Sequence, residues 1–313
     1  MNYKLLAKGI LSLLIIWTLL QFVNIEKTIS LVLTANPFFL FISMLLITIQ
    51  ITLSALNIWI LMENRPSISF RKLLKYYCFG WVAGLTSIGK IGEFSTAYYL
   101  KKDGLPYTKT VAVIFLDKFI TLVLFSVVSI VGTLWFFGFN NIPLLFFCTA
   151  LFFGACIFLI FFRTVTLTQV PLVGKIRFVK NFITKNEAHF VEFRNTFMDY
   201  FSAHKNLLAK NGAITILKLI VMSINGSILF LALNNSINPL YMGFIIAIAA
   251  IVALAPVTLS GLGIVEATYI YLALLVSIQP ETALATELLT LALNYSWAVI
   301  IIGFWLFFHK QAK

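Results

Sequence analysis

The stretch SIGKIGEFSTAYYLKKDG, from Ser87 to Gly104, places charged residues and glycines between long apolar runs. Of the 313 residues in the chain, 61% are hydrophobic and only 11% are charged, and the mean hydropathy is +0.99. Soluble globular domains do not reach this composition, and apolar runs long enough to cross a roughly 30 Å hydrocarbon core recur along the chain. The sequence therefore predicts an all-α polytopic membrane protein, with a single integral membrane domain over residues 1–313 and no separate soluble catalytic domain.

Six apolar runs are long enough to be full spans. They are Leu5 to Val23, Pro37 to Met62, Val111 to Phe139, Pro143 to Phe162, Ala213 to Leu233 and Ala283 to Phe308. The first is interpreted as a retained span because it is longer than the apolar part of a typical signal peptide.

Two further apolar regions, Leu73 to Leu100 and Leu240 to Ile278, are interrupted by glycine-rich polar motifs. Their leading pieces, Leu73 to Ile88 and Leu240 to Ala255, would each be about 24 Å long as helices, which is short for a straight crossing. Each region is expected to form either a re-entrant hairpin or a pair of short crossings. The total is eight or more membrane helices if the hairpin arms are counted separately.

Basic residues set the expected orientation. The formal net charge is +12, and the cations gather at one side if each broken region enters and leaves by the same face. Those on that side are Lys4, Lys8, Arg65, Arg71, Lys72, Lys75, Lys101, Lys102, Lys109, the cations of the loop from Arg163 to Lys210, Lys310 and Lys313. The opposite side carries Lys27. We therefore expect a multi-pass protein of the plasma (cell inner) membrane with both termini cytoplasmic, and no nucleic-acid partner.

The cytoplasmic loop from residue 163 to 210 is expected to contain an amphipathic helix. Apolar residues recur near helical spacing at Phe190, Phe193, Phe197, Tyr200, Phe201 and Leu208, with charged residues between them. Such a helix would lie on the inner leaflet, or would pack against the other loops.

The two broken regions follow the same order of features. In each, an apolar piece leads to glycines, a glutamate (Glu93 or Glu266), a proline and then a long span. An acidic residue follows near the start of that span, Asp117 in the first case and Glu287 in the second. Because the first region starts and ends in the cytoplasm and the second outside, the pattern predicts an inverted repeat. Inverted repeats with broken helices are common among secondary transporters, which bind substrate near the bilayer midplane.

Glu93 and Glu266 are the main candidates for function. Each follows a glycine cluster and is expected in the first turn of a helix, where the helix dipole contributes about 0.3 to 1 kcal/mol. A charge at membrane depth costs at least about 2.5 kcal/mol, so a partner or an aqueous cavity is also expected. Lys90 is the expected partner of Glu93. Glycines 80, 84 and 89 also have a purely structural interpretation, which is close approach of two helices.

Other polar residues have simpler explanations. Lys118 and Lys218 would snorkel to the interface, and the buried amides of Gln50, Asn57, Asn225 and Asn294 would join helices by hydrogen bonds. The cysteines, Cys78, Cys148 and Cys156, lack metal-ligand spacing, and no catalytic constellation is present. No cofactor, metal or catalytic residue is expected.

Three segments together resemble a known family: GKIGEFSTAYYLKKDG, LDKFITLVLF (Leu116 to Phe125) and PVTLSGLGIVEAT (Pro256 to Thr268). The chain is similar to the flippase-like family that shares the transmembrane region of lysylphosphatidylglycerol synthase. Three departures from the family pattern are Ile88 in place of proline and Lys90 in place of arginine in the first motif, and Val265 where the last motif usually has arginine. The change at Val265 puts in doubt any anion-binding role for this half.

The resemblance and the repeat together predict a set of residues for substrate binding and translocation. The resemblance implies Gly89, Lys90, Gly92, Glu93, Asp117, Lys118, Gly261, Gly263 and Glu266, and the repeat adds Glu287. The resemblance also implies a membrane lipid translocase for an anionic or zwitterionic amphiphile, such as a phospholipid derivative or a polyprenyl-phosphate-linked glycan.

Two alternatives remain open at this point. One is a lipid-modifying transferase of the phosphatidylglycerol lysyltransferase type, which is disfavoured because the aminoacyl-transferase domain of the bifunctional relatives is not expected after Lys313. The other is a non-catalytic partner of a cell-envelope lipid or glycan synthase. Membrane lipids are the expected partners in each case. The identity of the lipid, the energy coupling and the oligomeric state are not predicted by the sequence.

Overall fold

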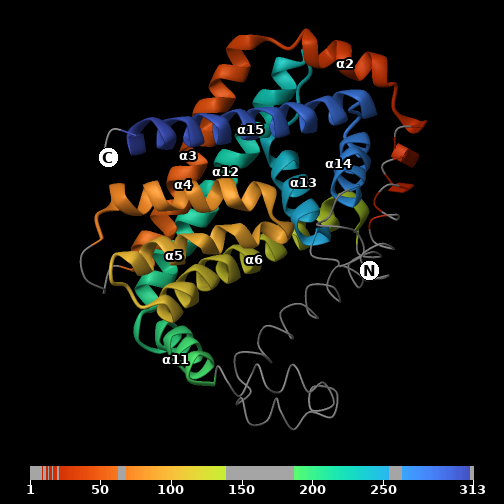
Figure 1. Ribbon diagram of the computed structural model, residues 1–313. Coiled ribbons are helices and arrows are strands. Elements are labelled where there is room, and N and C mark those ends of the chain that lie inside the picture. The colour runs from red at the N-terminus through yellow and green to blue at the C-terminus, as the bar shows by residue number, and fades with distance from the viewer. Residues whose placement is uncertain are drawn as a thin grey trace.

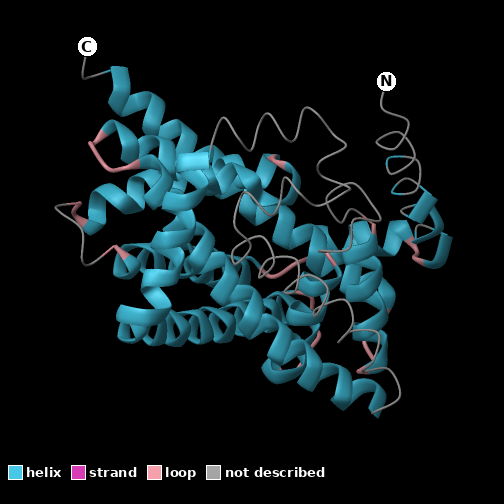
Figure 2. Cartoon of the chain, turned by 90° about the horizontal axis from the view of Figure 1, so that it is seen from below, coloured by secondary structure: helices cyan, strands magenta, loops and turns pink. Residues whose placement is uncertain are grey.

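The computed structural model describes residues 9, 12, 14, 15, 17–19, 21–62, 68–138, 187–253 and 263–310. All regular elements among these residues are helices, as Figures 1 and 2 show. Four of them are long and apolar enough to cross a membrane: α3 (Pro37–Leu61), α6 (Tyr107–Phe137), α12 (Lys205–Ala232) and α15 (Pro280–Lys310, apolar over Pro280–Phe304). The prediction of an all-α polytopic membrane protein is confirmed. The predicted span from Pro143 to Phe162 lies outside the described residues, and only part of the one from Leu5 to Val23 lies inside them.

The first residue of a helix is set by local capping residues rather than by the point where the apolar run begins. The Asn36 side chain accepts a hydrogen bond from the Phe38 N–H at 3.0 Å, and Pro37 opens α3. The same asparagine-proline start opens α13 (Pro239–Val252), where the Asn238 side chain accepts from the Leu240 N–H at 2.9 Å. An N-cap asparagine satisfies a free amide of the first turn, and proline at the first position lacks the amide that would otherwise be unpaired.

Helices α3 and α12 form an antiparallel pair in the middle of the molecule (Figure 1). Ser43 near the start of α3 donates to Asn225 near the end of α12 at 2.7 Å. At the other end, Asn57 Nδ2 donates to Thr215 Oγ1 at 2.9 Å. These bonds confirm that Asn57 and Asn225 join helices, as the sequence predicted.

The first broken region folds back on itself. Helix α4 (Phe70–Thr86) is followed by a 3₁₀ helix, η1 (Ile88–Phe94), and by α5 (Ser95–Lys102), and both pack against α4. Lys72 Nζ and Asp103 Oδ1 form an ion pair of 2.7 Å across the open end, so the region enters and leaves by one face, as predicted. This element is called the first hairpin below.

The second broken region forms a second hairpin from α13 and α14 (Ile264–Leu275), which contact each other. Its open end lies beside the start of α3, because the Asn36 N–H bonds to Ala232 O and the chain reaches Pro239 a few residues later. The first hairpin opens at the other end of α3, where Trp59 Nε1 bonds to Ile68 O. The two hairpins therefore point in opposite directions, as the sequence predicted.

The arms of both hairpins are short. At 1.5 Å per residue, α4 with its 17 residues is about 26 Å long, and α13 with its 14 residues is about 21 Å long. Each is shorter than a hydrocarbon core of roughly 30 Å. The lengths favour re-entrant hairpins over pairs of full crossings.

Helix α11 (Glu187–Ala203) occupies the end of the molecule opposite α2 (Ile25–Leu33), as Figure 1 shows. Its aromatic face packs on α6: the ring centroids of Phe193 and Phe115 are 5.4 Å apart, and those of Phe197 and Phe119 are 5.6 Å apart. The helix thus packs against the long helix α6, a position that differs from packing against the other loops.

Candidate functional site

A cluster of charged side chains lies at the break of the first hairpin. Glu93 of η1 is 5% exposed and Asp117 of α6 is fully buried. Lys118 Nζ forms an ion pair with Glu93 Oε2, and it lies 3.6 Å from Asp117 Oδ2. We call Glu93, Asp117 and Lys118 the charged cluster.

This arrangement corrects two sequence-based interpretations. Lys118 was expected to snorkel to the interface, but its ammonium turns towards Glu93, because its flexible aliphatic stem spans the gap between α6 and η1. Glu93 was expected in the first turn of an α-helix, but it lies in the 3₁₀ helix before α5. The 3₁₀ segment keeps Glu93 next to α6. The side chain of Lys90, the expected partner of Glu93, lies outside the described part of the structure.

Glycines let the first hairpin close tightly around Glu93. A Cβ atom on Gly84 would lie 2.8 Å from Glu93 Cγ, and one on Gly80 would lie 2.9 Å from the Glu93 carbonyl oxygen. A Cβ on Gly92 would lie 2.7 Å from the Gly84 backbone nitrogen. The Gly92 N–H donates to Ser87 Oγ at 2.7 Å and fixes the turn. The structural role proposed for Gly80 and Gly84 is therefore real, and it is also what positions the glutamate.

A layer of buried polar groups continues from Asp117 to α12 and α3. Asn211 Nδ2 donates to Asp117 Oδ1 at 3.1 Å and to the Asn57 carbonyl oxygen at 3.2 Å. Asn57, Asn211 and Thr215 are all fully buried. Tyr77 of α4, which is 2% exposed, shares a side-chain hydrogen bond with Ser54 and lies within electrostatic range of the charged cluster.

The sequence interpretation missed Asn211 and Thr215 for an identifiable reason. Hydropathy starts the span at Ala213, whereas α12 begins eight residues earlier at Lys205. Asn211 fell between the predicted loop, which ends at Lys210, and the predicted span, whereas Thr215 lay inside the span and was not singled out. The nearby pattern of Asn211, Thr215 and Lys218 at helical spacing was the available signal, since all three are buried.

A separate pair of acids, Glu266 and Glu287, lies on α14 of the second hairpin and on the following helix α15. Gly263 has φ of +85°, and its N–H donates to Glu266 Oε2 at 2.7 Å, so Glu266 caps the start of α14. This is the first-turn position that the sequence predicted. Glu287 of α15 lies within electrostatic range of Glu266. Gly261, the remaining residue of this motif, lies outside the described residues.

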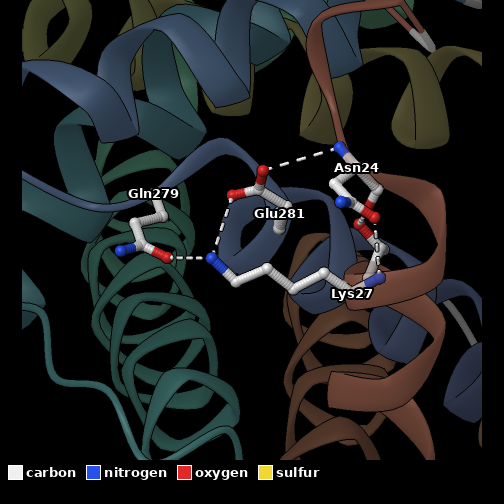
Figure 3. A network of polar contacts seen from close by, with 5 residues as sticks. Asn24, Lys27, Gln279 and Glu281 are labelled. Atoms are coloured by element: carbon white, nitrogen blue, oxygen red, sulfur yellow. Dashed lines mark hydrogen bonds and ion pairs between the residues drawn. The ribbon is translucent and has the colours of Figure 1, made fainter.

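On the other side of the molecule, Lys27 ties α2 to the exit of the second hairpin (Figure 3). Its ammonium donates to Gln279 Oε1 at 2.6 Å and lies 3.8 Å from Glu281 Oε2. Lys27 was the single cation expected on this side. The contacts give it a structural role at the open end of the hairpin.

A hollow of about 750 Å³ lies between α11 and Lys109 of α6, lined also by Glu192, Asn195 and Asp199. Its lining does not include the charged cluster. Helix α11 packs on α6 at Phe115 and Phe119. Asp117 lies two residues from each of them and therefore on a different face of α6.

The fold and the site define a multi-pass α-helical membrane protein with charged side chains at the break of a discontinuous helix. The chain belongs to the family described as the lysylphosphatidylglycerol synthase TM region, which it matches over residues 5–303. Among curated proteins, no sequence matches the chain. The resemblance seen in the motifs is thus confirmed at the level of the family.

Proposed function

We propose that this protein is a membrane lipid translocase of the plasma membrane. It moves an amphiphile with an anionic or zwitterionic headgroup, such as a phospholipid derivative or a polyprenyl-phosphate-linked glycan. Both termini face the cytoplasm in this proposal. Membership of a family named for a lipid synthase membrane region supports a lipid-related role.

The observation that carries the proposal is the charged cluster at the broken helix. Buried ions in a membrane protein are costly, and an ion pair that serves stability alone is often replaceable by apolar residues. The ammonium group of Lys118 would bind a lipid phosphate. The two carboxylates would balance its charge or bind a cationic headgroup. Glu93 would exchange partners when the headgroup arrives.

The second hairpin supports the same proposal. Glu266 and Glu287 place two carboxylates in the other half of the molecule, on elements that point the opposite way. Inverted pairs of discontinuous helices are the arrangement in which transporters expose a site to each side in turn. In this scheme Glu266 and Glu287 bind an amine-bearing headgroup or carry a coupling proton.

Reconstitution into liposomes tests the proposal directly. Fluorescent phospholipids in the outer leaflet would be quenched chemically, and the fraction that escapes quenching would report movement between leaflets. Glu93→Gln is the informative variant, because Lys118 keeps Asp117 at 3.6 Å and the two charges that remain in the cluster, one of each sign, balance. Loss of one charge-assisted hydrogen bond corresponds to about 1.5 to 3 kcal/mol, so the rate is expected to fall at least about tenfold.

Asp103→Asn provides the matched control. It makes the same carboxylate-to-amide change on the first hairpin, but at the open end, where Asp103 pairs with the exposed Lys72. We expect the rate to stay within about twofold of the unchanged protein, because exposed pairs contribute little. Equal rates for Glu93→Gln and the unchanged protein would remove the proposed site. Formation of an aminoacylated lipid by the purified protein from aminoacyl-tRNA would favour a transferase instead.

A further inference from the structure

Several oxygens of the buried polar layer beside the charged cluster have no hydrogen-bond partner. Within the described residues, these include Asn57 Oδ1, Asn211 Oδ1 and Thr121 Oγ1, and Asp117 Oδ2 has only the Lys118 ammonium at 3.6 Å. Asn57, Asn211 and Asp117 are each fully buried. An unsatisfied buried polar atom costs about 1 to 3 kcal/mol, so a group of them calls for a ligand.

The orientation of the Asn211 amide is fixed by its neighbours. Its nitrogen faces two acceptors, Asp117 Oδ1 and the Asn57 carbonyl oxygen. Turning the amide over would place its oxygen against both of them, which is repulsive. The unpaired atom of Asn211 is therefore its oxygen.

The unpaired oxygens come from adjacent parts of three helices. The oxygen and nitrogen of one amide are about 2.3 Å apart, so Asn211 Oδ1 lies within about 5.5 Å of Asp117 Oδ1. Thr121 is one turn from Asp117 on α6, and Asn57 bonds to Thr215, one turn from Asn211 on α12. The oxygens are thus on one polar layer between α3, α6 and α12.

The charges near Asp117 also favour a bound cation. Among the described side chains of the charged cluster, two carboxylates, Glu93 and Asp117, lie beside one ammonium, that of Lys118. Lys218, a buried cation of α12, is seven residues from Asn211, about 10 Å along the helix, and has contacts of its own. One further positive charge on the amide side of Asp117 would complete an alternating series of charges.

We propose that Asp117, Asn211, Asn57 and Thr121 bind one monovalent inorganic cation, Na⁺ or K⁺. Carboxylate, amide and hydroxyl oxygens are the ligands that hard cations take. Asp117 is the one carboxylate among the four proposed ligands, and one carboxylate suits a monovalent ion. Among the described residues, no group of three or more His, Cys, Asp or Glu offers the ligands of a transition metal. This inference does not depend on lipid transport.

Thermal unfolding of the purified full-length protein in detergent tests the site without measuring transport. Melting temperatures would be compared in NaCl, KCl and choline chloride at equal ionic strength. A cation at a hundred times its Kd is expected to raise the melting temperature by about 3 to 5 °C over choline. The NaCl and KCl arms show which ion binds.

Two variants test whether the salt-specific rise in melting temperature comes from this site. Asp117→Asn keeps the size of the side chain and removes the charge, and Asn211→Leu removes an unpaired oxygen. Both are expected to lose the salt-specific rise. Asn225→Leu is the matched control, since it removes another buried amide of α12, one that is already bonded to Ser43. It is expected to lower the melting temperature in every salt and to keep the rise.

Three results would overturn the inference. The first is equal melting temperatures in the three salts, which is expected if water alone bonds to the oxygens. The second is a salt-specific rise that persists in both Asp117→Asn and Asn211→Leu. The third is a rise that disappears in Asn225→Leu as well. A protein that moves lipid without any salt effect would retain the proposed function and lose only the cation site.

Discussion

Replacing Gly92 by alanine is expected to destabilise the first hairpin. A Cβ at this position would lie 2.7 Å from the Gly84 backbone nitrogen and closer still to the Ala83 carbonyl group. Both neighbours are backbone of α4, so a side-chain rotation cannot relieve the contact, and η1 must move away from α4. Overpacking of this kind costs about 1 to 3 kcal/mol, and the backbone contact places Gly92→Ala near the upper value.

Thermal unfolding in detergent measures this effect. A loss of about 3 kcal/mol corresponds to a fall of about 4 to 5 °C in the melting temperature, at about 1.5 °C per kcal/mol for a chain of this size. Gly212→Ala is the control, because Gly212 lies within α12 and a Cβ added to it would have no neighbour within 4 Å. Alanine is the better helix former by up to about 1 kcal/mol, so the control is expected to melt at the same or a slightly higher temperature.

A third glycine variant distinguishes an effect on lipid movement from an effect on stability. A Cβ on Gly84 would meet Glu93 Cγ at 2.8 Å, and a flexible side chain can yield where backbone cannot. Gly84→Ala is therefore expected to be less destabilising than Gly92→Ala while slowing lipid movement, because it displaces Glu93 from Lys118. The reasoning would be refuted if Gly92→Ala melted at or above the temperature of the unchanged protein.

The remaining predictions concern α11 and the two open ends of the hairpins. Phe197→Ala removes a 2% exposed ring and is expected to cost about 3 to 5 kcal/mol and to expose α11 to limited proteolysis; unchanged cleavage would contradict the packing. The hydrogen bond from Lys72 lowers the pKa of Asp103 below its ordinary 3.8, so the pair stabilises the protein above that pH and ceases to do so as the pH falls through the lowered pKa. Lys72→Gln should therefore lower the melting temperature slightly at pH 7 and leave it unchanged in acid below the Asp103 pKa, and an equal effect at both pH values would count against the pair. Lys27→Gln is expected to change stability by less than about 1 kcal/mol, because its ion pair with Glu281 is exposed on the lysine side; a larger fall in melting temperature would show a stronger clamp.

Much of the fold was predictable from the sequence because membrane insertion depends on local properties. An apolar run of sufficient length predicts a span, and asparagine followed by proline predicts a helix start, whatever the run later packs against. The break from Gly89 to Glu93 was equally visible as charge and glycine in an apolar stretch. Helix boundaries were predicted less well, since α12 begins at Lys205 in polar sequence that hydropathy assigns to the loop.

The partners within the site depended on the tertiary structure. Glu93 and Lys118 are 25 residues apart, and Asp117 and Asn211 are 94 apart, so no spacing rule connects them. They meet because the first hairpin folds back at its glycines and brings η1 against α6, while α12 packs against α3 and α6. For the same reason, the structural and functional interpretations of the glycines could not be separated in the sequence.

The sequence by itself determined that this chain is a multi-pass membrane protein, that two of its apolar regions are interrupted, and that glutamates stand at the interruptions. Only the tertiary structure decided which cation meets Glu93, which side of α6 carries Asp117, and where acceptor oxygens remain unpaired. The physical reason is the range of the interactions. Hydrophobic transfer and helix capping act on neighbouring residues of the chain, whereas the pairing of buried charges and amides depends on helices that are distant in sequence and in contact only after folding.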